Sequence, residues 1–148
     1  MYFWKSQLLA EDLKRNSINE TGLKNYYMGT AVLTTICSSL AILQPPENMQ
    51  ALVTESLVTL LITIIGINAA FKANGGGTGT RFIEKAVLLS FPLLIKVMVA
   101  GLVVGVVTGV LEMAGTSKFQ LEWGTSISII AIEAVFYWRL VTHIRRAA

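Results

Sequence analysis

The chain alternates between long apolar stretches and short polar connections. A hydrocarbon core of about 30 Å is crossed by about 20 helical residues, and four stretches reach that length. They cover residues 26–45, 51–71, 86–111 and 123–142. Each is too long for a buried strand, and backbone groups in lipid must be bonded within their own segment. The pattern therefore predicts an all-α membrane protein, with residues 25–148 forming a bundle of four transmembrane helices.

Residues 1–24 precede the first predicted span and mix apolar with charged side chains. The large apolar side chains of this segment are Phe3, Trp4, Leu8, Leu9 and Leu13. A helix with one apolar and one charged face can lie along a membrane surface. We therefore expect a short N-terminal amphipathic segment on the cytoplasmic side, for which an interfacial helix is one interpretation.

Basic residues gather on one side of the predicted bundle. If the chain crosses four times, one side receives Lys5, Lys14, Arg15, Lys24, Lys72, Arg81, Lys85, Arg139, Arg145 and Arg146. The other side has only Lys118, and Lys96 lies inside the third span. Connections rich in lysine and arginine stay in the cytoplasm. We expect a multi-pass plasma-membrane protein, in a bacterial inner membrane, with both termini and the flexible connection Gly75–Thr80 in the cytoplasm.

Composition narrows the class of protein further. Charged residues make up 14% of the chain and hydrophobic residues 53%, whereas a soluble domain carries about 25% charged residues. The net charge of +3 follows from the topology, so we expect no nucleic-acid binding. The chain has one cysteine, one histidine (His143) and no metal-spaced cluster. We therefore expect a protein that is not an enzyme and binds neither metal nor cofactor.

Two ionisable residues inside predicted spans are the main candidates for a functional site. Lys96 in the third span and Glu133 in the fourth lie at overlapping depths, and a charge inside the bilayer usually faces a partner or an interior. They form either a structural ion pair, a proton or ion site, or two separate polar contacts. Tyr137 shares a helical stripe with Glu133, and Glu55 near the start of the second span extends the candidate set.

Small and polar residues recur at helical spacing along the spans. Gly101, Gly105 and Gly109 in the third span lie four residues apart and so fall on nearly one face, which predicts close helix packing. On the second span the corresponding stripe is Glu55, Thr59, Thr63, Gly66 and Ala70. Pro92, one turn before Lys96, removes a helical hydrogen bond and predicts a hinge or kink.

These features predict a small, non-enzymatic membrane protein that acts as an oligomeric or complex-forming subunit. Its expected partners are the lipid bilayer and either copies of itself or other membrane subunits. The glycine face and the polar stripes favour a pore-like or membrane-perturbing role. One alternative is an ion- or proton-coupled transporter that uses Lys96 and Glu133, and another is an assembly factor for a membrane complex.

Overall fold

A computed structural model describes residues 5–15, 25–30, 33–34 and 48–148. These residues are almost entirely helical and contain no strand. The elements are α1 (Ser6–Lys14), α3 (Met49–Ala73), the 3-10 turn η1 (Gly76–Thr78), α4 (Phe82–Met113) and α5 (Lys118–Ala147). Residues 25–30 and 33–34 are also helical. Most of the predicted first span, 26–45, lies outside the described residues.

Three helices are long and apolar enough to cross a membrane: α3, α4 and α5, with 25, 32 and 30 residues. Each begins before the span predicted from its sequence and ends after it. The predicted all-α class and membrane-spanning character are confirmed to this extent. The fourth span, the division at residue 24 and the orientation of the termini stay predictions.

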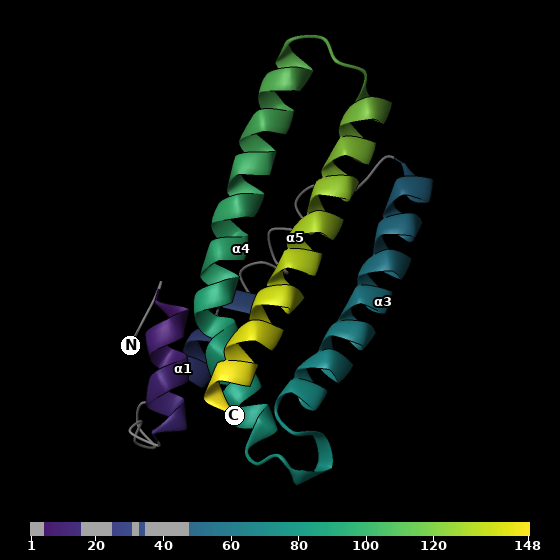
Figure 1. The fold of residues 1–148 in the computed structure, drawn as a ribbon. Coiled ribbons are helices and arrows are strands. Elements are labelled where there is room, and N and C mark those ends of the chain that lie inside the picture. Colours follow the sequence, from purple (N-terminus) through teal and green to yellow (C-terminus); the bar gives the residue numbers. More distant parts are fainter. Residues whose placement is uncertain (1–4, 16–24, 31–32, 35–47) are drawn as a thin grey trace.

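The three long helices form one layer in which α5 lies between α3 and α4 (Figure 1). The backbone N–H of Asn48 donates to Glu122 Oε1 at 3.3 Å, which places the start of α3 beside the start of α5. α3 and α5 are therefore parallel, and α4 is antiparallel to both. Both outer helices pack mainly against α5 rather than against each other.

Polar residues fix where two of these helices begin. The side-chain oxygen of Asn48 accepts from the backbone N–H groups of Gln50 and Ala51, each at 3.1 Å. Ser117 accepts from the N–H of Gln120 at 3.4 Å at the start of α5. These caps supply partners that the first turn of a helix otherwise lacks. Apolar periodicity alone did not reveal these starts.

The glycine-rich connection between α3 and α4 contains turn hydrogen bonds, and its flexibility stays a prediction. Lys85 Nζ donates to Asn74 Oδ1 at 3.0 Å, and Asn74 Nδ2 donates to the Thr80 carbonyl at 3.2 Å. Gly75 adopts φ +99°, a left-handed conformation that suits glycine. The buried Asn74 thus ties both ends of the connection together.

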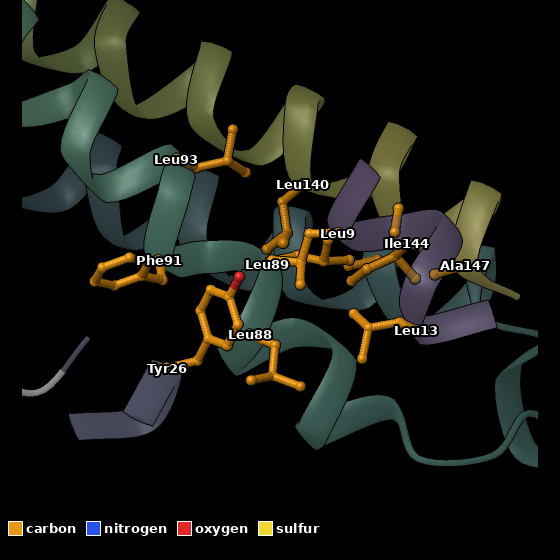
Figure 2. Close-up of a cluster of buried hydrophobic side chains, with 12 residues drawn as sticks. Leu9, Leu13, Tyr26, Leu88, Leu89, Phe91, Leu93, Leu140, Ile144 and Ala147 are labelled. Atoms are coloured by element: carbon orange, nitrogen blue, oxygen red, sulfur yellow. The ribbon is translucent and has the colours of Figure 1, made fainter. Parts of the chain in front are cut away.

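Burial divides the molecule into two zones. At one end α1 covers α4 and α5 with Leu9 and Leu13, which pack with Leu88, Leu89 and Ile144 in a closed apolar core (Figure 2). Toward the other end, the long helices expose large apolar side chains, including Leu57, Leu60, Ile64, Leu102, Val103, Val106, Ile127 and Val135. Water disfavours such a surface, whereas lipid accommodates it.

We call the covered end the basic end. It comprises α1, the connection 74–81 and the last turns of α5 (Figure 1). The predicted N-terminal amphipathic segment is present here as α1, whose buried face is Ser6, Leu9, Ala10 and Leu13. That face packs on α4 and α5. Its apolar residues therefore contact protein side chains.

Candidate functional site

The polar stripes predicted on the second and fourth spans face each other between α3 and α5. Thr63 Oγ1 donates to Glu133 Oε1 at 3.2 Å near the middle of both helices. One turn further on, Gly66 lies against the ring of Tyr137, so close that a methyl group added to the glycine would overlap it. The buried Ser126 lies on the same stripe of α5. This seam joins four of the residues singled out from the sequence.

Lys96 and Glu133 do not pair, so the expected ion pair is not formed. Glu133 faces Thr63 on α3, whereas Lys96 on α4 faces α1 and donates to Ser6 Oγ at 3.5 Å. The depths inferred from the sequence were similar, but the direction in which each side chain leaves its helix differs. The third interpretation, two separate polar contacts, matches this geometry.

A polar junction joins α1, α4 and α5 at the basic end, and sequence reasoning missed it. Ser6 Oγ lies 2.9 Å from His143 Nε2 and also accepts from Lys96 Nζ. The other ring nitrogen of His143 is buried and has no hydrogen-bond partner among the described residues. Two arginines lie near the histidine on the same stripe of α5, Arg139 four residues before it and Arg146 three residues after it.

The Ser6–His143 contact brings a hydroxyl and an imidazole together, as in nucleophilic catalysis. Both residues are only 3% exposed, because α1 closes over them. A substrate therefore has no access to the serine oxygen in this arrangement. One feature of the sequence could have indicated that Ser6 is buried. Ser6, Leu9 and Leu13 follow helical spacing, which places the serine on the apolar face of α1.

The glycine face predicted on α4 is open. A methyl group added to Gly101, Gly105 or Gly109 would meet no atom of another described element within 4 Å. Large exposed side chains flank these glycines, among them Leu102, Val103 and Val106. Close glycine contacts within the described chain occur elsewhere, where Gly66 lies against Tyr137 and Gly29 against Phe91.

The remaining predicted residues occupy ordinary positions in the helices. Pro92 is buried inside α4, which continues through it from Phe82 to Met113. Glu55 is half-buried two turns before Thr63, and its backbone carbonyl accepts from Thr59 Oγ1 at 2.8 Å. No group of three His, Cys, Asp or Glu side chains lies close enough to hold a metal ion in the part of the chain that is described.

Comparison of the chain with protein-family models, with curated proteins and with solved structures finds no match.

Proposed function

We propose that this chain is a non-enzymatic integral membrane protein that works as the subunit of a homo-oligomer. The observation that carries the proposal is the open glycine face of α4. Three glycines in register let the backbone of a second helix approach closely, and such packing is a main source of helix association in lipid. No atom of another described element lies within 4 Å of the position of a side chain added at these glycines, and we propose that a second copy packs there.

The arrangement of the long helices supports the same proposal. Because α5 lies between α3 and α4, the helices form a single layer (Figure 1). In the half of α4 that carries the glycines, Thr108 Oγ1 lies 3.2 Å from Thr125 Oγ1 of α5, and Leu102 and Val106 are exposed. A second copy placed against this side of α4 would cover these exposed apolar side chains.

Disulfide crosslinking in native membranes tests the interface. In a background with Cys37→Ser, Leu102→Cys next to the glycine face should form dimers readily on oxidation. Leu60→Cys is the matched control, because it is also exposed, apolar and inside a span, but on α3. Equal crosslinking at both positions, or at neither, would contradict an interface on α4. Crosslinking only to another membrane protein would favour the assembly-factor alternative.

The proposed topology has four spans, with both termini on the cytoplasmic side of a bacterial inner membrane. Its support is the distribution of lysine and arginine: Lys14 in α1, Arg81 in the connection 74–81, and Arg145 and Arg146 at the end of α5 share one end, whereas Lys118 lies at the other. Alkaline phosphatase fused after residue 148 or inserted at Gly77 should stay inactive, and a fusion at Gly115 should be active. The reverse pattern would refute this orientation.

Proton or ion transport is the second candidate, and Glu133 is the observation that favours it. This carboxyl lies in the middle of a membrane-spanning helix and contacts the hydroxyl of Thr63. Intramembrane carboxyls commonly bind protons or cations along a pathway. Purified protein in liposomes should then conduct protons or cations, and Glu133→Gln should abolish that flux. Flux unchanged by Glu133→Gln would exclude this site and leave a pore-like activity to the oligomer.

A double-mutant cycle distinguishes the observed contact from the pair expected from the sequence. Thr63→Val with Glu133→Leu, which removes both the donor and the acceptor, should show a coupling energy of about 0.5–1.5 kcal/mol, as for other interhelical hydrogen bonds in membranes. Lys96→Met with Glu133→Leu should be additive within about 0.5 kcal/mol, because the residues share no partner among the described contacts. Unfolding in bicelles supplies both values, and a larger coupling for Lys96 would mean that the helices pack differently.

A further inference from the structure

Lys96 and Arg139 lie where the lipid-exposed surface of α4 and α5 ends. On α4 the continuous run of exposed large apolar side chains extends from Val99 to Met113, and on α5 the last one is Trp138. From Lys96 to Met113 the helix rises about 25 Å at 1.5 Å per residue, close to the thickness of a hydrocarbon core. Both cations therefore lie at the depth of the lipid headgroups.

Lys96 and Arg139 lie close enough for their charges to interact, and further positive groups lie at this level. Lys96 reaches the first residue of α1, Ser6, and α1 begins there with no acidic residue in its first turn and no side-chain cap. Lys5, immediately before the helix, is exposed. The positive end of a helix and a lysine beside it both favour an anion.

The position of Trp138 adds an independent indication of a membrane interface. This residue is 65% exposed, and the Arg139 guanidinium carbon lies 5.3 Å from the centre of its ring. Tryptophan is enriched at the level of lipid headgroups, where its ring is apolar and its N–H is solvated. Arginine beside it can donate two hydrogen bonds to a phosphate.

We infer that Lys96, Arg139 and the start of α1 bind the phosphate of an anionic phospholipid. The guanidinium and the ammonium would contact the phosphate, while the acyl chains lie along the exposed apolar side chains of α4 and α5. The lysine that the sequence placed inside the bilayer would thus interact with a lipid headgroup. This inference requires membrane insertion but is independent of the proposed oligomer.

Thermal unfolding of the purified full-length protein in neutral detergent tests the inference. Phosphatidylglycerol should raise the midpoint by several degrees more than the same amount of phosphatidylcholine. The double variant Lys96→Gln/Arg139→Gln should lose most of that difference. The matched control is Lys72→Gln/Arg145→Gln, which removes the same charge from exposed positions at the same end of the molecule and should keep the full difference.

Three results would overturn the inference. The first is an equal loss in the control variant, which would mean that only total charge matters. The second is equal stabilisation by phosphatidylcholine, and the third is equal stabilisation by inorganic phosphate, which would indicate an anion site unrelated to lipid. If the double variant does not fold, Arg139→Gln alone provides the test, because this side chain is exposed, and Arg139→Lys should retain part of the effect.

Discussion

Replacing Gly66 with leucine should separate α3 from α5 and destabilise the protein more than any other single substitution proposed. The glycine lies against the Tyr137 ring, where even a methyl group would overlap side-chain atoms near the α5 backbone. Overpacking of a closed interface typically costs about 1–3 kcal/mol, so Gly66→Ala should cost that much and leucine more. Unfolding of the purified protein in bicelles measures both.

Gly124→Ala and Gly124→Leu are the matched controls for this prediction. Gly124 is also helical and on a membrane-spanning segment, but within the described part of the chain no atom of another element lies within 4 Å of the position where a side chain would be added. Both control variants should keep the stability of the parent protein. If Gly66→Leu were as stable as Gly124→Leu, the α3–α5 seam described above would be incorrect.

Unlike substitution of Gly66, substitution of Gly105 should leave the stability of the single subunit unchanged. It should instead weaken the association between subunits. No atom of another described element lies within 4 Å of the position where a side chain would be added to Gly105, so Gly105→Leu should leave the protein folded and inserted. The leucine would hold a second helix away from the glycine face, where packing requires close backbone approach. We expect self-association to weaken at least about tenfold, which corresponds to about 1.4 kcal/mol.

Energy transfer between labelled copies in liposomes measures that change. Gly124→Leu again serves as the control, since it adds the same side chain to another open helical position. An unchanged association constant for Gly105→Leu would contradict an interface through this face. Lower thermal stability of the isolated subunit would instead indicate that the glycines pack within the chain.

The sequence predicted the membrane-spanning helices well, because the length of an apolar stretch can be read directly along the chain. Length and apolarity along the chain locate α3, α4 and α5, and helical spacing correctly aligned Thr63 and Gly66 on one stripe. The ends of the helices were missed by several residues. They depend on single caps such as Asn48 and Ser117, and at the end of α5 on Ile144 and Ala147, which are buried in one core with Leu9 and Leu13 of α1.

Whether Lys96 pairs with Glu133 could not be predicted from the sequence. The depth of a residue along a helix does not determine the direction in which its side chain points. Two residues at the same level of a bundle can face different neighbours, and the choice depends on which helices are adjacent. Here the Glu133 side chain on α5 points toward α3, and the Lys96 side chain on α4 points toward α1. The junction of Ser6 with His143 was missed for the same reason, since the residues are 137 positions apart.

Native mass spectrometry of the protein released from detergent tests the central claim most directly. The account predicts that the wild-type chain of 16.1 kDa appears as a defined multiple of that mass, and that Gly105→Leu shifts it to the single-chain mass while Gly124→Leu does not. A wild-type protein that stays monomeric at every concentration, in detergent and in lipid nanodiscs, would contradict the proposed oligomeric subunit.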